Sequence, residues 1–582
     1  MKKKIVSMIL AVVLSLSLMG CSDQTRGTIT DPSGSVSVQD PAKTTPTERE
    51  SVLDKFLAGE YGEFDLNGSQ MKGKANYVSG ATVMMETEAC ADASAVDGSM
   101  FLNTFAPGEV QVIPWNTEEY KYVAENTWMN VKTSPFSTFA ADVDTASYAN
   151  VRRMLTRGQE VPVDAVRIEE MINYFHYDYK TPTNGDPFSV TTEMAPCPWN
   201  ENSRLLMVGL SAPELDTSER VNSNLVFLID VSGSMDGEDR LGLVQRSFKL
   251  LCEELQPGDR VSIVTYASGD KIVLEGATGD EKAKICDAIE DLFAGGGTNG
   301  GAGIQSAYRL AEQYFIEDGN NRVILATDGD LNIGITDEGG LTRLIEEEAK
   351  SGVFLSVLGF GWGNISDTRM EALADHGNGN YSYIDSISEA RKVLIEEMGS
   401  TLFTVAKDVK LQVEFNPALV KGYRLIGYEN RTMAAEDFAN DAKDGGEIGA
   451  GHQVTALYEV ALTDSKQEVP EVASRYGEDG TVATGSLNGE YLTVNIRYKE
   501  PDGDTSKLLV FPVTDETYHE EMSENLSWAA GVAQAGMLLK KSEFAGTSEL
   551  KSVLERLGKL DIAQNDEYRK EFLYLYSRAN IQ

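Results

Sequence analysis

Residues 225–235 read LVFLIDVSGSM, an apolar run followed by one aspartate and two serines. Five apolar residues in a row are typical of a strand that is buried on both faces of a parallel sheet. Asp230, Ser232 and Ser234 follow at the carboxyl end of this strand, where open α/β sheets place their binding sites. The stretch therefore predicts both a sheet and a site at its edge.

The surrounding sequence alternates similar apolar runs with amphipathic helices. We expect strands at 225–229, 261–266, 271–274, 323–326, 354–358 and 381–384. We expect helices at 241–255, 282–292, 302–315, 341–350, 367–375 and 388–404. This alternation predicts a doubly wound, Rossmann-like α/β domain over residues 222–405, with a mainly parallel sheet covered on both faces. The short run 271–274 predicts an antiparallel edge strand.

Two further loops supply polar side chains at strand ends. Gly295-Gly296-Gly297-Thr298 precedes a helix, and Thr327-Asp328-Gly329 follows the fourth strand. Carboxylate and hydroxyl oxygens are hard ligands that suit Mg²⁺ or Ca²⁺. The sequence thus predicts a metal site whose residues are Asp230, Ser232, Ser234, Thr298 and Asp328.

In order and residue type, these three elements resemble the metal ion-dependent adhesion site of von Willebrand factor A domains. The resemblance implies that Ser232 and Ser234 bind a cation directly, which would be Mg²⁺ or else Mn²⁺ or Ca²⁺. It implies that Thr298 binds directly or through water, and that Asp230 and Asp328 do so while orienting the hydroxyls. It also implies an open coordination position that takes a carboxylate from a protein partner.

The sequences on either side of this domain resemble those of bacterial A-domain lipoproteins of the YfbK type. The similar stretches are 142–179, 413–431 and 447–458, and the resemblance extends from about residue 136 to the C-terminus. This resemblance indicates the domain architecture of the chain more than its function.

The flanks are expected to form one β-sandwich. Strand-like runs lie at 188–194 and 204–210 in an N-terminal flanking domain (133–221), and at 409–415, 454–460, 492–498 and 508–513 in a C-terminal β-rich domain (406–582). Helices are expected at about 164–175, 526–539 and 550–557, before a polar tail. Two strands alone are marginal. We therefore expect the A domain to be inserted in a sandwich that both flanks build, with small α-rich N- and C-terminal segments.

The N-terminus predicts export. Three lysines precede an apolar run at 5–18, which is shorter than the ~20 residues that span a bilayer. The run ends in Leu18-Met19-Gly20-Cys21, which resembles the bacterial lipobox and implies an acylated Cys21 after a signal peptide (1–21). This predicts an exported protein, lipid-anchored on the outer face of the cell envelope. Residues 22–50 read as a flexible tether, and 51–132 remain unassigned.

Composition limits the partners. The chain has 51 Lys and Arg against 91 Asp and Glu, a net charge of −40, which argues against binding nucleic acid. Four histidines without metal-ligand spacing exclude a zinc hydrolase of the HExxH type. Five cysteines do not form a disulfide scaffold. Cys252 and Cys286 are expected to be buried free thiols.

We expect no enzyme. Asp142-Val143-Asp144-Thr145 resembles a phosphatase nucleophile motif, but a turn with Asp144 or Thr145 as helix N-cap is the simpler interpretation. His452 is interpreted as structural. The expected function is that of a cell-surface lipoprotein whose metal site binds a protein partner, in adhesion or scaffolding. The alternative is an envelope assembly or stress-regulatory factor whose A domain acts on another protein.

Overall fold

The computed structural model describes residues 117–579, except 184, 215–219, 299, 330–337, 442, 444, 472–488, 502, 504 and 548. The chain divides into two compact units, residues 1–49 and 50–582, and every described residue belongs to the second. The predicted signal peptide with Cys21, the tether and most of the unassigned segment lie outside the described residues.

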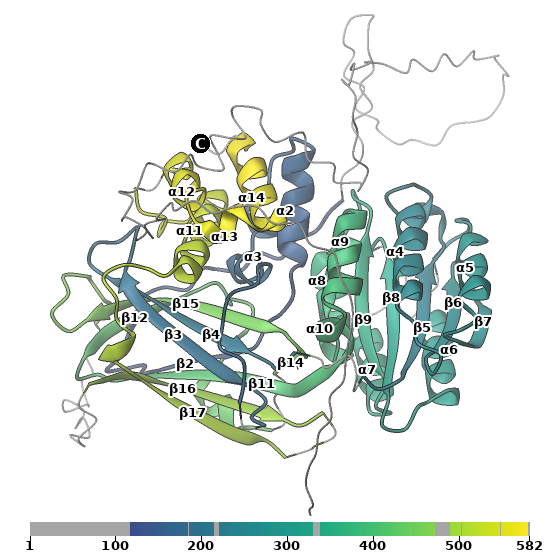
Figure 1. Ribbon diagram of the computed structural model, residues 1–582, viewed down its shortest axis with the longest axis horizontal. Coiled ribbons are helices and arrows are strands. Elements are labelled where there is room, and N and C mark those ends of the chain that lie inside the picture. The colour runs from purple at the N-terminus through teal and green to yellow at the C-terminus, as the bar shows by residue number, and fades with distance from the viewer. Residues whose placement is uncertain are drawn as a thin grey trace, which may run out of the picture. The chain divides into compact units, whose positions relative to one another are not determined.

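The A domain is built on a six-stranded sheet in the order β10-β9-β8-β5-β6-β7 (Figure 1). Its strands are β5 (Ser223–Asp230), β6 (Arg260–Tyr266), β7 (Asp270–Thr278), β8 (Asn320–Thr327), β9 (Phe354–Phe360) and β10 (Tyr381–Ile384). All neighbours pair in parallel except β6 and β7, which are antiparallel. The predicted parallel sheet and its antiparallel edge strand are therefore confirmed.

Helices cover both faces of this sheet, as the apolar runs predicted. One core packs α4 (Leu241–Glu253), α5 (Lys282–Glu290) and α9 (Ile387–Arg391) against the sheet. A second core packs α6 (Gly300–Gln313), α7 (Glu338–Ala349) and α8 (Asp367–His376) against the other face. Strand residues alternate between the two cores, so that Phe227 faces the first and Leu228 the second.

The helix expected at 388–404 was wrong as a single element. It divides into α9, a π-helical turn (Lys392–Glu396) and α10 (Met398–Leu402), and strand β11 (Thr404–Phe415) begins at its end. The Glu397 amide donates to the Lys392 carbonyl at 2.8 Å, five residues back. Lys392 is buried, pairs with Glu397 and lies 4.4 Å from the Tyr174 ring centre. A tertiary contact thus accompanies the local change of helix type.

The flanks form a two-sheet sandwich with strands from both sides of the A domain (Figure 1). One sheet has the order β1-β12-β15-β4-β3, from β1 (Met129–Asn130), β12 (Val420–Ile426), β15 (Gln453–Leu462), β4 (Arg204–Ser211) and β3 (Ser189–Pro196). The other has the order β13-β2-β11-β16-β17, from β13 (Thr432–Met433), β2 (Phe136–Ala140), β11, β16 (Glu490–Lys499) and β17 (Lys507–Thr514). Strand β14 (Gly446–Gly449) also pairs with β11.

Pairing across the insertion decides the architecture. Strand β4 pairs with β15, which places Leu206 opposite Tyr458, and β2 pairs with β11. The inner faces of the two sheets share one apolar core. The predicted insertion of the A domain in a sandwich of both flanks is therefore confirmed.

A helical layer covers the outer face of the first sheet. It contains α2 (Ala146–Thr156), α3 (Ile168–Asn173), α11 (Glu524–Lys540), α12 (Leu550–Leu557), α13 (Asp561–Gln564) and α14 (Glu567–Arg578), with a 3₁₀ turn at Val163–Ala165. Two expectations were wrong here. The helix expected at 164–175 is the 3₁₀ turn followed by the shorter α3, and the expected polar tail is α13 and α14. Phe572 and Tyr576 of α14 are buried among aromatic rings, so this segment is part of a core and not an exposed tail. Among the described residues, no helix has both the length and the apolar character to cross a membrane.

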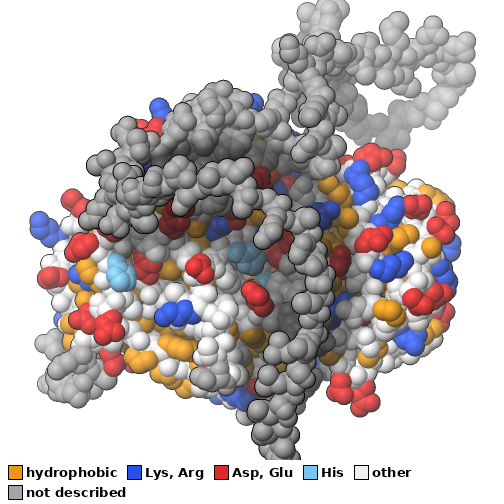
Figure 2. Space-filling model, viewed as in Figure 1, with side chains coloured by type: hydrophobic (Ala, Val, Ile, Leu, Met, Phe, Trp, Pro, Cys, Tyr) orange, Lys and Arg blue, Asp and Glu red, His pale blue; other side chains and the backbone are white. Residues whose placement is uncertain are grey.

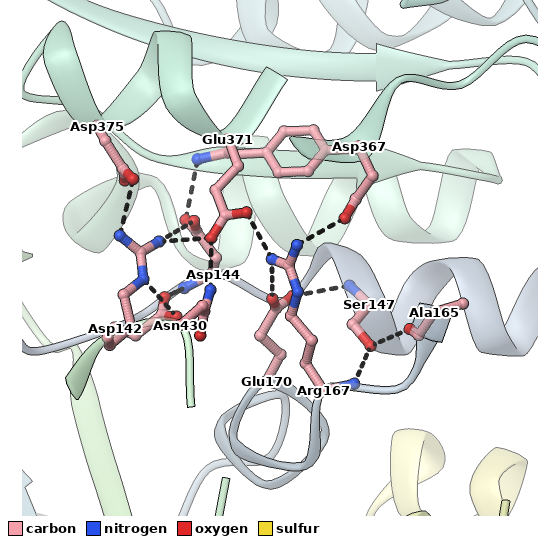
Figure 3. A network of polar contacts seen from close by, with 12 residues as sticks. Asp142, Asp144, Ser147, Ala165, Arg167, Glu170, Asp367, Glu371, Asp375 and Asn430 are labelled. Carbon is pink, nitrogen blue, oxygen red and sulfur yellow. Dashed lines mark hydrogen bonds and ion pairs between the residues drawn. The ribbon is translucent and has the colours of Figure 1, made fainter. Parts of the chain in front are cut away.

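A buried ionic network joins the A domain to the flanks (Figure 3). Arg431 contacts Asp142, Asp144 and Glu371 at 3.0, 3.3 and 3.0 Å, and Arg167 contacts Glu371 at 2.8 Å. Glu371 belongs to α8 of the A domain, whereas both arginines belong to the flanks. These pairs connect the domain to the sandwich.

Part of this network is the sequence that resembles a phosphatase motif. The Asp144 amide donates to Asp142 Oδ1 at 3.0 Å, and Asp144 Oδ1 accepts from the Tyr381 amide at 3.0 Å. Thr145 occupies the N-cap position of α2, but its side chain makes no capping hydrogen bond. The turn before a helix is confirmed, whereas the predicted side-chain cap was wrong: Thr145 makes no capping hydrogen bond, and the Asp144 carboxylate is bound to the Tyr381 amide and to Arg431.

Candidate metal centre

The first site loop leaves strand β5 at its carboxyl end. Asp230 is the last residue of the strand and is fully buried. Its Oδ1 accepts from the Ser232 amide at 2.9 Å, which fixes the turn that follows. The Ser232 and Ser234 hydroxyl oxygens lie 2.9 Å apart. Ser234 is half-buried and Gly233 is exposed, so the loop meets the surface beside the buried carboxylate.

The second carboxylate comes from the neighbouring parallel strand. β5 and β8 pair with Ile229 opposite Ala326, so Thr327 and Asp328 leave the sheet at the same edge as Asp230. The Thr327 hydroxyl donates to Asp230 Oδ2 at 3.2 Å. Asp328 is fully buried, and its Oδ2 accepts from Asn364 Nδ2 at 2.8 Å.

The glycine loop lies against the first loop through backbone hydrogen bonds. The Gly295 amide donates to the Val231 carbonyl at 2.8 Å, and the Gly233 amide donates to the Gly296 carbonyl at 3.0 Å. Gly296 has φ +91°, and a Cβ there would lie 2.8 Å from the Ser268 Oγ, so a side chain is disfavoured. These contacts place the loop that carries Thr298 beside Ser232. Asp230, Ser232, Ser234 and Asp328 thus lie together at one edge of the sheet, beside the loop that carries Thr298.

The electrostatics of this edge favour a cation. Burial raises the pKa of Asp230 to about 6, hydrogen bonds from Ser232 lower it, and the charge of Asp328 raises it. Two buried carboxylates that interact in this way cost free energy when both are ionised. A divalent cation bound between them would remove that cost.

The donor set fits a hard, octahedral cation. With Mg²⁺–oxygen distances of about 2.0–2.1 Å, neighbouring ligands in an octahedron lie about 2.9 Å apart. The Ser232 and Ser234 hydroxyls are hydrogen-bonded to each other at 2.9 Å, so their oxygens already lie at a separation that two ligands of one cation would have. The carboxamide Oδ1 of Asn364 is buried without a partner among the described residues, beside an Nδ2 bound to Asp328. Within the described part of the chain, no group of three or more His, Cys, Asp or Glu could hold a metal. This edge offers two carboxylates, and the other side chains that could bind a cation there carry hydroxyls.

The sequence pattern missed two residues of this edge. Asn364 follows β9, the next parallel strand, and its position at a carboxyl strand end was the available signal. Arg240 donates to the Ser234 carbonyl at 2.9 Å and to the Trp362 carbonyl at 2.7 Å. It thereby joins the first loop to the loop after β9, a connection that no local pattern records.

Other residues singled out from the sequence lie outside this site. His452 Nδ1 accepts from the Gly449 amide at 3.2 Å, and burial lowers the pKa of His452 to about 4. This fits its structural interpretation. Cys252 is a buried free thiol as expected, whereas Cys286 is only half-buried because it lies at the edge of the α4–α5 contact. Cys197 is also free and buried.

Comparison with known proteins agrees with this architecture. Residues 224–396 match the von Willebrand factor type A domain, residues 400–581 match "Uncharacterized protein YfbK, C-terminal", and residues 114–207 match a model described as von Willebrand factor.

Figure 2 shows Asp and Glu side chains over the visible face of both the A domain and the sandwich, interspersed with Lys and Arg.

Two uncharacterized bacterial relatives match longer stretches of the chain. The chain is 43% identical to the uncharacterized protein YfbK of Escherichia coli over 471 residues, which covers 80% of this chain and 81% of that protein. It is 32% identical to an uncharacterized protein of Synechocystis, over 54% of this chain and 70% of that protein. A solved structure, a von Willebrand factor type A protein from Catenulispora acidiphila, covers 69% of this chain and 91% of its own at 16% identity, with a TM-score of 0.37. With its A domain, its C-terminal domain and 43% identity along four fifths of its length, the chain belongs to the YfbK family of A-domain proteins.

Proposed function

We propose that the chain is a cell-surface lipoprotein that binds a divalent cation and, through it, a protein partner. The cation is Mg²⁺, or else Mn²⁺ or Ca²⁺, and the partner supplies a carboxylate to an open coordination position. The role is adhesion or scaffolding, without catalysis. The cation ligands are Asp230, Ser232, Ser234, Thr298 and Asp328.

One observation carries this proposal. Two hydroxyl oxygens lie 2.9 Å apart beside a buried carboxylate at the carboxyl edge of a parallel sheet. That arrangement offers hard ligands to a cation while one side of the loop reaches the surface. A domains generally mediate protein–protein interaction, which supports a protein partner.

The first test measures stabilisation by metal. A ligand that binds only the folded state at about 100 times its Kd stabilises the protein by about 2.7 kcal/mol. The thermal midpoint of the chain beginning at residue 22 should therefore rise with Mg²⁺ or Mn²⁺ over EDTA. Asp230→Asn should abolish that rise, whereas Asp236→Asn, at an exposed carboxylate of the same loop, should keep it. An equal rise in wild type and Asp230→Asn would refute the site.

The second test seeks the partner. Affinity capture from the envelope fraction is compared with and without EDTA, using wild type and Asp230→Asn as baits. A partner retained only by wild type with Mg²⁺ supports the proposal. Metal-independent recovery of an envelope assembly or stress-regulatory factor would instead favour the alternative role.

A further inference from the structure

The segment that precedes the sandwich forms a short clasp on the A domain. Residues 117–120, here called the N-terminal clasp, lie along the loop after β9 at residues 361–366. The Thr117 amide donates to the Gly363 carbonyl at 2.7 Å, and the Glu119 amide donates to the Ile365 carbonyl at 2.9 Å. Glu119 and Ser366 form a parallel bridge. The clasp thus pairs with this loop through backbone hydrogen bonds outside the sheet.

Glu118 is the side chain that fixes the clasp. Its Oε1 accepts from the Gly363 amide at 2.9 Å, and Arg153 of α2 lies 3.0 Å away. Both side chains are only 4% exposed. A buried carboxylate that accepts a backbone hydrogen bond and pairs with arginine is held tightly. The loop after β9 is therefore attached to helix α2 of the flank as well as to its own domain.

The same loop reaches the metal site at two points. Asn364, next to Gly363, donates to Asp328 Oδ2 at 2.8 Å. The Trp362 carbonyl accepts from Arg240, whose other nitrogen holds the Ser234 carbonyl. Asn364 thus contacts Asp328 directly, and Trp362 is linked to the Ser234 loop through Arg240. The Asn364 Oδ1 is buried and, among the described residues, has no hydrogen-bond partner. A cation bound at this site would bring a water or another donor that could satisfy this oxygen.

We propose that Asn364 is a positioning residue of the metal site, and that the N-terminal clasp sets the position of Asn364 through Glu118. This inference rests on the proposed function. Asn364 orients Asp328 and accepts a hydrogen bond from a water on the cation. The clasp keeps the loop in place, so cation affinity depends on a segment about 110 residues away from the first ligand in sequence.

The test uses the chain beginning at residue 22, with Mg²⁺ or Mn²⁺ alone as the probe. Dissociation constants are measured by titration calorimetry, and bound Mn²⁺ is followed by electron paramagnetic resonance. Loss of a residue that orients a metal ligand weakens metal binding about 10–100-fold. We expect a loss in that range for Asn364→Ala and Asn364→Ser. Glu118→Ala should weaken binding several-fold and alter the Mn²⁺ spectrum.

Two variants separate positioning from general damage. Glu118→Gln keeps an oxygen for the Gly363 amide and should restore most of the affinity. Glu119→Ala removes an exposed carboxylate next door, keeps the backbone pairing and should bind as wild type does. In EDTA, hydrogen exchange of peptides covering 361–366 should be faster in Glu118→Ala than in Glu119→Ala.

The outcomes are distinguishable. If wild type binds neither Mg²⁺ nor Mn²⁺, the proposed function is refuted. If wild type binds and both Asn364 variants bind equally well, only the positioning role is overturned. If the Asn364 variants lose affinity and Glu118→Ala does not, the clasp is overturned.

Discussion

Replacing Arg431 by methionine tests whether the buried ionic network holds the A domain to the sandwich. The arginine is 13% exposed and pairs with Asp142 at 3.0 Å, Asp144 at 3.3 Å and Glu371 at 3.0 Å. It also pairs with Asp375 at 2.8 Å, but that carboxylate is 38% exposed. Methionine keeps much of the apolar stem and removes the charge.

The magnitude follows from which carboxylates lose their cation. Asp375 is exposed enough that its pair contributes only about 0–1 kcal/mol. Glu371 keeps Arg167 at 2.8 Å. Asp142 and Asp144 are 2% and 5% exposed and are left without this arginine. Removing one partner of a buried pair costs about 3–5 kcal/mol, so we expect Arg431→Met to lower the free energy of unfolding by that amount.

Guanidinium denaturation measures this loss, with Arg246→Met as the control. Arg246 is 52% exposed and pairs with Glu238, which is 92% exposed, so its loss should cost under about 1 kcal/mol. Adding Asp142→Asn and Asp144→Asn to Arg431→Met should recover part of the stability, because the orphaned charges are removed. A loss no larger than that of Arg246→Met, or no recovery in the triple variant, would refute the reasoning.

Three further predictions concern pH, packing and anchoring. Burial raises the pKa of Glu170 to about 8 and of Glu571 to about 7, so the folded state binds these protons more tightly than the unfolded state. The free energy of unfolding should therefore rise as the pH falls from about 8.5 to about 6.5, and a fall in melts at fixed ionic strength would contradict this. An added Cβ at Gly209 would lie 2.4 Å from the Tyr179 ring. Gly209→Ala should thus cost about 1–3 kcal/mol by denaturation, and an unchanged midpoint would count against this packing. Cys21→Ala should release the protein from membranes or block its processing, whereas unaltered fractionation would argue against lipid attachment.

Elements whose pattern is local could be predicted from the sequence. Strand β10 (Tyr381–Ile384) and helix α12 (Leu550–Leu557) lie where their apolar spacing placed them. The strand is a short apolar run that is buried throughout, and the helix has one apolar face, so each shows a recognisable periodicity in its own residues. The contact between Ser232 and Ser234 is local as well, because both lie in one turn after a strand.

Strand β12 (Val420–Ile426) was missed for the opposite reason. It contains Arg424, which is 3% exposed and pairs with Glu459 at 2.6 Å. A charged residue in a short run indicates a surface segment unless its partner is known. That partner comes from β15, so the strand could be recognised only once the sheet was assembled.

The sequence by itself therefore predicted the alternation of strands and helices in the A domain, apart from the divided helix at its end, together with the five candidate ligands and the order of the flanking segments. Each of these patterns lies in residues that are neighbours along the chain. Only the tertiary structure showed that Asn364 donates a hydrogen bond to Asp328 and that Glu118 accepts one from the Gly363 amide. The same is true of the ion pair by which Arg431 joins the sandwich to the A domain. These partners are far apart along the chain. Their distances depend on how sheets and helices pack, and no local periodicity records that packing.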